Sequence, residues 1–168
     1  MARSEIGQVI VGMSSAIFDD ICQVLPEHIP EIFEIEKAAY PFPWTEGMLT
    51  DCLKTNYYFY AMFRQGRVIA YGVMSCILDE SHILNLCVSP EYQKQGLGKK
   101  MLCRLLDKAR VNQSHTVFLE VRESNHTAQH LYEDIGFNRL GNRKEYYPDE
   151  VGREDAIIYA KELVITPV

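Results

Sequence analysis

One stretch decides the fold of this 168-residue chain: Ile83-Leu84-Asn85-Leu86-Cys87-Val88-Ser89-Pro90, followed after two residues by Gln93-Lys94-Gln95-Gly96-Leu97-Gly98. It predicts a strand buried on both faces, a stop at the proline, a short loop and a helix that begins at Gly96. The first N–H groups of a helix have no backbone partner, so a helix that begins here offers them to a phosphate. The stretch therefore predicts an anion site between a central strand and a helix.

The charge around this loop supports an anion site. The whole chain has a net charge of −6, yet residues 92–110 contain one acidic residue, Asp107, and six basic ones. Three lysines, Lys94, Lys99 and Lys100, flank the expected start of the helix. The alternative is an ordinary solvated helix face. The position of the lysines beside the free N–H groups favours phosphate binding.

Length and composition limit the class of protein. With 168 residues, 47% of them hydrophobic, the chain fits one domain with a proper core. No window of the sequence approaches the apolar length of a membrane span, and the N-terminal residues lack a contiguous apolar signal core, so we expect neither feature. Five scattered cysteines without a C-x-x-C pair predict reduced, mostly buried thiols and no metal site. These features predict a cytoplasmic protein, and the negative charge argues against nonspecific nucleic-acid binding.

The hydrophobic pattern divides the chain into alternating strands and helices. Strands are expected at 21–24, 57–63, 67–77, 83–88, 116–121, 137–144 and 156–162, and helices at 28–39, 45–54, from 96 onward, and from 124 or 125 to Gly136. Thr45 is the expected N-cap of the second helix, and Gln65-Gly66 the turn of a hairpin.

This order predicts an α/β (α+β) fold in which a mixed central sheet of about six to seven strands is flanked by about four helices. Residues 1–18 read as an N-terminal extension, with a possible strand at 9–11, and residues 19–168 as the single domain.

Several motifs in order carry a family resemblance. Gln93, Gly96 and Gly98 form Q-x-x-G-x-G after a strand. They are followed by Phe118-Leu119-Glu120-Val121-Arg122-Glu123-Ser124-Asn125, by Leu131-Tyr132-Glu133-Asp134-Ile135-Gly136-Phe137, and by Arg143-Lys144-Glu145-Tyr146-Tyr147-Pro148 with Gly152-Arg153-Glu154-Asp155-Ala156. This set resembles the GNAT N-acetyltransferases, and within them the RimI branch of ribosomal-protein alanine N-acetyltransferases. The resemblance spans about residues 21–163 and implies the GNAT fold and acetyl-CoA as cosubstrate.

Acetyl transfer to an amine requires a group that takes the proton of the amine. An N-terminal amine has a pKa of roughly 7.7–8, so a carboxylate, directly or through a water, can deprotonate it near neutral pH. Glu120 is a charged residue in an apolar strand, where burial is costly without a partner or a task. It could instead pair with Arg122 or face solvent. The resemblance implies that Glu120 is the proton acceptor.

The departing thiolate requires a proton donor. Tyr132 lies on the helix after the Glu120 strand, and a phenol with a pKa of about 10 can protonate a thiolate. From the sequence alone, core packing is the commoner role of such a tyrosine. The resemblance implies that Tyr132 is the donor.

The resemblance also implies the cofactor contacts. Backbone groups of Leu86, Cys87 and Val88 are expected to pair with the pantetheine arm and to direct an N–H at the thioester oxygen. The loop of Lys94, Gln95, Gly96, Leu97, Gly98 and Lys99 is expected to wrap the pyrophosphate, and Asn125 to contact the cofactor, cap its helix, or both. Gln93 replaces the usual arginine of the signature, which removes one charge contact. Cys87 is expected to pack rather than to carry the acetyl group, so transfer is direct.

The acceptor is inferred from a separate segment. An acidic loop at 145–155 with Tyr146 and Tyr147 suits an extended basic peptide, although a polar hairpin loop is the plain alternative. Tyr40, Phe42 and Trp44 either line the same cleft or pack. The RimI resemblance implies that the acceptor is the N-terminal alanine of the eighteenth protein of the small ribosomal subunit, whose tail is basic. We expect a monomer. The alternatives are a GNAT enzyme acting on lysine side chains, polyamines or other small amines, and a CoA-binding module without catalysis.

Overall fold

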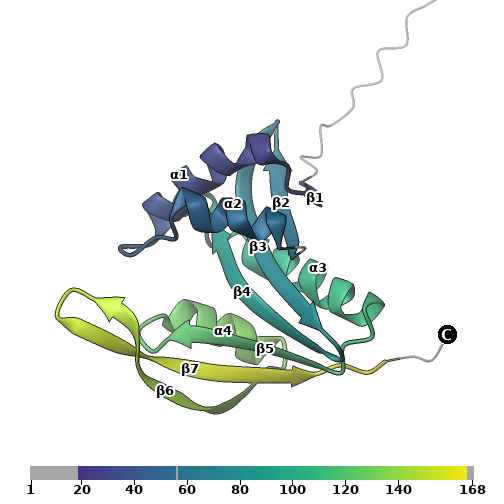
Figure 1. Ribbon diagram of the computed structural model, residues 1–168, viewed down its shortest axis with the longest axis vertical. Helices are drawn as coiled ribbons and strands as arrows, with labels where there is room; N and C mark the ends of the chain where they lie inside the picture. The colour runs from purple at the N-terminus through teal and green to yellow at the C-terminus, as the bar shows by residue number, and fades with distance from the viewer. Residues whose placement is uncertain (1–18, 56, 166–168) are drawn as a thin grey trace, which may run out of the picture.

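The structure, a computed structural model, describes residues 19–55 and 57–165. They form a seven-stranded sheet with helices on both faces (Figure 1). The strands are β1 (Asp20–Gln23), β2 (Tyr58–Arg64), β3 (Arg67–Ile77), β4 (Glu80–Val88), β5 (Thr116–Arg122), β6 (Asn138–Asp149) and β7 (Gly152–Glu162). The helices are α1 (Ile29–Ala39), α2 (Glu46–Lys54), α3 (Leu97–Val111) and α4 (His126–Asp134), with 3-10 turns η1 (Pro26–His28) and η2 (Pro90–Tyr92).

The sheet order is β1-β2-β3-β4-β5-β7-β6, and every neighbouring pair is antiparallel except β4 and β5. The mixed α/β architecture and the order of elements from residue 20 onward confirm the expectation from the sequence. The suggested strand at 9–11 lies outside the described residues.

The parallel pair is short, and this shapes the molecule. Residues 80–83 of β4 pair with residues 116–119 of β5, and beyond Ile83 and Leu119 the two strands have no ladder pairs. Figure 1 shows the sheet opening from this point into two arms, β1–β4 above and β5–β7 below. Each arm stays paired internally along its length, so the opening is a permanent feature of the backbone.

The described residues form two hydrophobic clusters, and one of them joins the two arms. One cluster lies under α3 and α4 and joins both arms, with Met101, Leu105, Leu119 and Tyr132 among its members. The other lies between the sheet and helices α1 and α2, on the upper arm. The side chains of β3 are buried from Val68 to Ser75, so β3 is the strand covered on both faces.

The expectation that 83–88 is buried on both faces was therefore wrong. Leu84 is 37% exposed, and Asn85 and Leu86 are half-buried. The physical reason is the separation of β5, which leaves this part of β4 without a neighbour on one side. The strand also begins earlier than expected, because Glu80 and Ser81 belong to it and the turn before it is at Leu78, with φ of 56°.

The structure confirms the predicted cap of α2 and the predicted hairpin turn. Thr45 accepts a hydrogen bond from the Met48 N–H at 3.2 Å and caps α2. Gln65 and Gly66 both have positive φ in the hairpin turn between β2 and β3. The cysteines are less uniformly buried than expected, since Cys22 and Cys103 are exposed.

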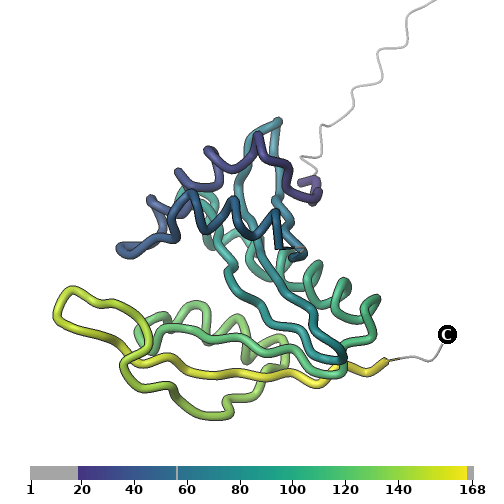
Figure 2. Tube along the Cα trace, viewed as in Figure 1, coloured from purple at the N-terminus to yellow at the C-terminus, as the bar shows by residue number. Residues whose placement is uncertain are grey.

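The segment 145–155 also differs from expectation. It was read as a loop, but β6 runs to Asp149 and β7 begins at Gly152. The acidic and aromatic residues of this segment therefore stand on a paired hairpin. Figure 2 shows the hairpin, in yellow and green, reaching out below the α1–α2 connection.

The close packing of α3 on β3 gives a first prediction. A Cβ at Gly72 would lie 2.9 Å from Leu105 Cδ1 and 3.2 Å from Met101 Cγ. Gly72→Val should lower the free energy of unfolding by about 1–3 kcal/mol, because it overpacks the main core. Denaturant unfolding measures this, and Gly141→Val is the matched control, since a Cβ there meets nothing within 4 Å. Equal stability of the two variants would contradict the tight contact.

Candidate active site

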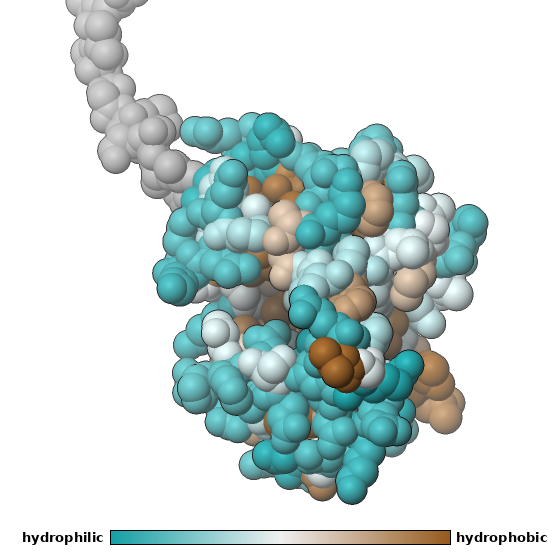
Figure 3. Space-filling model, turned by 90° about the vertical axis from the view of Figure 1, so that its left-hand side faces the viewer, coloured by the Kyte–Doolittle hydropathy of each residue, from teal (hydrophilic) through white to brown (hydrophobic). Residues whose placement is uncertain are grey.

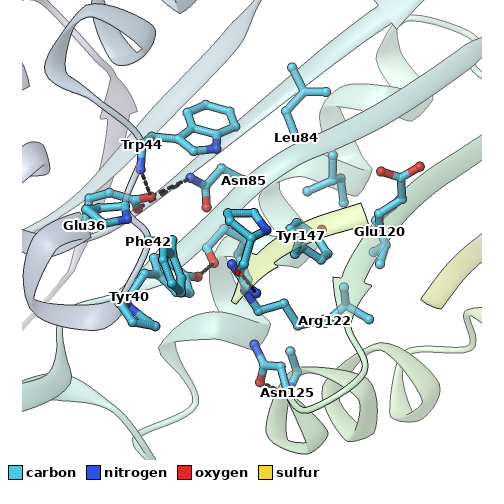
Figure 4. Close-up of a pocket in the computed structure, with 18 of the residues that line it drawn as sticks. Glu36, Tyr40, Phe42, Trp44, Leu84, Asn85, Glu120, Arg122, Asn125 and Tyr147 are labelled. Atoms are coloured by element: carbon cyan, nitrogen blue, oxygen red, sulfur yellow. Dashed lines mark hydrogen bonds between the residues drawn. The ribbon is translucent and has the colours of Figure 1, made fainter. Parts of the chain in front are cut away.

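A cavity of about 630 Å³ lies in the opening between the two arms. It is bounded by the α1–α2 connection, the outer part of β4, the end of β5, the start of α4 and the end of β6. Figure 3 faces this side of the molecule, where a recess with some hydrophobic residues lies between largely hydrophilic rims. Figure 4 shows its lining side chains.

The separation of the strands exposes backbone groups of β4 to the cavity. The Ser89 N–H bonds to the Ile69 carbonyl on β3 at 2.9 Å, so by the alternation of a strand Cys87 also faces β3, while Leu86 and Val88 face the opening. The carbonyl of Leu86 accepts from the Tyr40 hydroxyl at 3.0 Å. The structure thus offers the backbone N–H groups of Leu86 and Val88 to a ligand, and turns those of Cys87 away.

A buried carboxylate fixes the upper wall. Glu36, on α1, is 1% exposed and accepts from the Trp44 N–H at 2.9 Å and from the Tyr71 hydroxyl. The amide of Asn85 lies 3.4 Å from the same carboxylate (Figure 4). Because a buried charge without partners is costly, these bonds hold the α1–α2 connection against β3 and β4.

The lower wall is organised around Arg122 at the end of β5. Its guanidinium donates to the Pro148 carbonyl at 2.9 Å and to Glu154 Oε2 at 3.1 Å. It also stacks on Tyr147, 4.6 Å from the ring centroid, and faces Phe42 of the upper wall at 5.7 Å. The Arg122 side chain therefore links the two walls (Figure 4).

Glu120 lines the same cavity, with a side chain that is 23% exposed. Its ion-pair partner is Arg143 on β6, with Nε 2.9 Å from Oε1. The alternative that Glu120 pairs with Arg122 is therefore wrong. The Glu120 carboxylate raises the pKa of the Tyr146 phenol, so a second residue of β6 lies beside this carboxylate. In Figure 4, Glu120 and Leu84 lie on the side of the cavity away from Asn125.

Glu120 and Tyr132 approach the cavity from opposite faces of the sheet. Along β5 the residues Val117, Leu119 and Val121 are buried under the helices α3 and α4, so Glu120 points to the other face. Tyr132, on α4, belongs to the helix side and is 6% exposed, yet it also lines the cavity. Burial raises the pKa of its phenol to about 12, which keeps the proton bound at neutral pH.

The helix side carries the features expected of an anion site. Gly96 is the N-cap of the 15-residue helix α3, has φ of +78° and makes no side-chain cap bond. Lys94 and Lys99 are exposed beside it, whereas Leu97 packs into the main core. The side chain of Gln95 accepts from Arg64 at 3.1 Å and Lys100 bonds to the Asp19 carbonyl, so these contacts tie the loop to the upper arm.

Asn125 and Cys87 have clear structural roles. The Asn125 side chain accepts from the Ala128 N–H at 3.1 Å and caps α4, while the residue also lines the cavity. Cys87 is 3% exposed, and burial together with Glu36 raises the pKa of its thiol to about 12. A thiol that stays protonated is a poor nucleophile, which argues against an acetylated Cys87.

Comparison with known proteins agrees with this geometry. The sequence profile of the Acetyltransferase (GNAT) family matches residues 29–137. The chain belongs to the GNAT family. It is 39% identical over 132 residues to the [ribosomal protein bS18]-alanine N-acetyltransferase of Escherichia coli, covering 79% of this chain and 89% of that protein. The enzyme of the same name from Haemophilus ducreyi is 38% identical over 138 residues, covering 82% and 95%.

Solved structures show the same relationship. The crystal structure of the ribosomal-protein-S18-alanine N-acetyltransferase from Escherichia coli superposes with a TM-score of 0.83 and 35% identity, over 89% of this chain and 97% of that one. Ard1 from Thermoplasma volcanium, at 22% identity and a TM-score of 0.81, shares the fold. This chain is therefore a GNAT acetyltransferase, a family that uses acetyl-CoA.

Sequence reasoning missed part of this GNAT site. Glu36, Asn85 and Arg143 were not singled out, and Arg122 was considered only as a partner of Glu120. One signal was available for Glu36, because it follows Ile32 and Ile35 on the apolar stripe of α1, where a charge needs buried partners. The pairing of Arg143 with Glu120 depends on the sheet order, in which β7 lies between β5 and β6 although it follows both in the chain, and the Arg143 side chain reaches from β6 across β7 to Glu120.

The glycine loop gives a second prediction. Gly96→Val should raise the dissociation constant of acetyl-CoA about ten-fold or more, because a β-branched residue at positive φ distorts the loop that presents the N–H groups. Calorimetric titration measures it. Gly66→Val is the matched control, since Gly66 has a similar φ of +76° and equally open surroundings but lies in the β2–β3 turn. Unchanged binding by the Gly96 variant would contradict a phosphate site here.

Proposed function

We propose that this enzyme transfers the acetyl group of acetyl-CoA to the N-terminal alanine amine of the small-subunit ribosomal protein bS18, in the cytoplasm. The observation that carries the proposal is the placement of Glu120 and Tyr132 on opposite faces of one cleft, in a chain 36–39% identical to seven bS18-alanine N-acetyltransferases.

Each side of the cleft has a distinct task in this proposal. The helix side, with the loop from Lys94 to Lys99 and the capped start of α4, holds the CoA moiety, and the β4 groups at Leu86 and Val88 bind the pantetheine and the thioester oxygen. Acetyl-CoA supplies the activated acetyl group. The opposite side, with Glu120 and the two walls, receives the peptide.

The proton movements follow from this division. Glu120 takes the proton of the alanine amine, directly or through a water, as the nitrogen forms its bond to the acetyl carbon. The C–S bond breaks, and Tyr132 gives its proton to the sulfur of CoA. Transfer is direct, because the buried Cys87 thiol stays protonated.

Fewer acidic side chains of the lower wall are available to a basic peptide than the sequence suggested. Glu154 pairs with Arg122, and Asp155 accepts from the Glu145 N–H, so neither is available to a substrate. The acidic side chains that remain for a basic tail are Glu145, Asp149 and Glu150, around the tip of the hairpin.

An acceptor panel tests the proposal. Release of free CoA should be at least about ten-fold faster in kcat/KM with an alanine-initiated basic peptide than with an internal-lysine peptide or spermidine. Equal or better turnover of spermidine or the lysine peptide would assign a different acceptor to this GNAT site. CoA binding without turnover of any amine would make the chain a binding module.

A third prediction concerns the proton acceptor. Glu120→Gln should lower kcat about 10²-fold or more at neutral pH, since it removes the base, and should leave the dissociation constant of acetyl-CoA unchanged. Glu123→Gln, an exposed neighbour beyond the end of β5, is the control. An unaltered kcat across pH 6–9 would remove Glu120 from this role.

A fourth prediction follows from the raised pKa of Tyr132, about 12. Because the donor stays protonated until well above its ordinary range, kcat/KM should rise as the amine deprotonates near pH ~8 and stay level to about pH 10. Tyr132→Phe should lower kcat about 10²-fold and keep the same acidic limb. A wild-type decline centred near pH 9 that disappears in Tyr132→Phe would contradict a buried neutral phenol.

A further inference from the structure

An irregularity in β6 lies beside the candidate proton acceptor. Arg143 pairs with Ala156 and Tyr147 with Glu154, so three residues of β6, 144–146, stand opposite one residue of β7. Glu145, in the middle of this bulge, has φ of +49°, a conformation that is unfavourable for a residue with a side chain. Such a bulge persists only where its surroundings hold it.

Two residues of β7 hold the bulge. Asp155 Oδ1 accepts from the Glu145 N–H at 2.9 Å. Arg153 donates from Nε to the Glu145 carbonyl and from Nη2 to the Tyr146 carbonyl, both at 2.6 Å. The forked guanidinium thus satisfies two carbonyls of the bulge at once, and the carboxylate accepts from the N–H that precedes them.

Side chains on both sides of the bulge lie at the candidate site. Arg143 precedes it and pairs with Glu120 at 2.9 Å, and its guanidinium lies over the ring of Tyr146, 5.4 Å from the ring centroid. Tyr147 follows it, lines the cavity and stacks on Arg122. If the bulge relaxed into a regular ladder, the register after it would shift by two residues, so that Tyr147 would lie opposite Gly152 instead of Glu154.

The remaining residues of this segment fit the same arrangement. Gly152 has φ of +102° in the turn that begins β7. Glu154 bonds to Arg122 at 3.1 Å and accepts from the Ser124 N–H at 2.5 Å, just before the cap of α4. The segment from Gly152 to Asp155, which the sequence indicated as a family motif and as part of an acidic loop, therefore contacts the bulge, the lower wall and the start of α4.

We propose that Arg153 and Asp155 are positioning residues for the acceptor half of the cleft: they fix the β6 bulge so that Arg143 holds Glu120 and Tyr147 faces the peptide. This inference rests on the proposed function, because the acceptor half is defined by it. Neither residue lines the cavity, so their effect passes through the bulge.

Variants at Arg153 and Asp155 can test this inference, because both side chains are at least partly exposed. Arg153 is exposed and Asp155 half-buried, and exposed polar contacts contribute little to global stability. Loss of either should leave the folded enzyme and its acetyl-CoA site intact. A change in peptide kinetics can then be assigned to the bulge.

The experiment compares Arg153→Ala, Asp155→Ala and Asp155→Asn with Arg139→Ala. Arg139 lies on β6, the strand that contains the bulge, and its Nη2 donates to Asn142 Oδ1 at 2.7 Å, away from the bulge. For each variant we would measure KM and kcat for an alanine-initiated basic peptide, the dissociation constant of acetyl-CoA, and amide hydrogen exchange over 143–149.

The two alanine variants at 153 and 155 should exchange faster over 143–149 and raise the KM of the peptide about ten-fold or more, since a misplacement of ~1 Å can cost ~10²-fold in rate. Their acetyl-CoA dissociation constants should match the wild type. Asp155→Asn keeps an oxygen acceptor and should recover most of the peptide affinity, and Arg139→Ala should behave as the wild type.

Three results would overturn the inference: unchanged exchange in both alanine variants, faster exchange with unchanged peptide KM, or equal losses of peptide and acetyl-CoA binding. Failure of the proposed function reads differently. A wild-type enzyme that turns over lysine peptides or spermidine but no alanine peptide would refute the acceptor assignment, while the exchange measurement would still report whether Arg153 and Asp155 hold the bulge.

Discussion

The separation of β4 from β5 is the constraint on which the site depends. Four residues of each strand pair, and then the two arms diverge because each is committed to its own antiparallel partners, β3 on one side and β7 on the other. The unpaired edge of β4 would be a liability on a protein surface. Here it lines a cavity from Ile83 to Leu86, which shelters the unpaired backbone groups.

The second requirement is that the two arms keep a fixed distance, and the helices and the polar contacts share this task. The main core under α3 and α4 includes residues of both arms and sets their angle. On the opposite face, Glu36 holds the α1–α2 connection, and Arg122 lies between Phe42 of that connection and Tyr147 of the hairpin. Such preorganisation lets a cleft orient an amine and a thioester without a large rearrangement.

Local chemistry explains which parts could be predicted from the sequence. The start of α3 at Gly96, the cap at Thr45 and the turn at Gln65-Gly66 depend on neighbouring residues, and the structure confirms them. The exposure of Leu84 depends on the position at which β5 separates from β4, and residues 83–88 contain no signal for that position. Likewise, the composition of residues 145–155 predicts a polar loop. The segment is paired nevertheless, because Arg153 and Asp155 hydrogen-bond to a bulge in β6, and these contacts join residues far apart in the segment.

The most direct test of the central claim is mass spectrometry of the N-terminus of bS18 from cells that lack this protein and from the same cells supplied with it. The account predicts that bS18 begins with an unmodified alanine in the first case and an acetylated alanine in the second, and that the Glu120→Gln protein does not restore acetylation. Full acetylation of bS18 in cells without this protein would contradict the account.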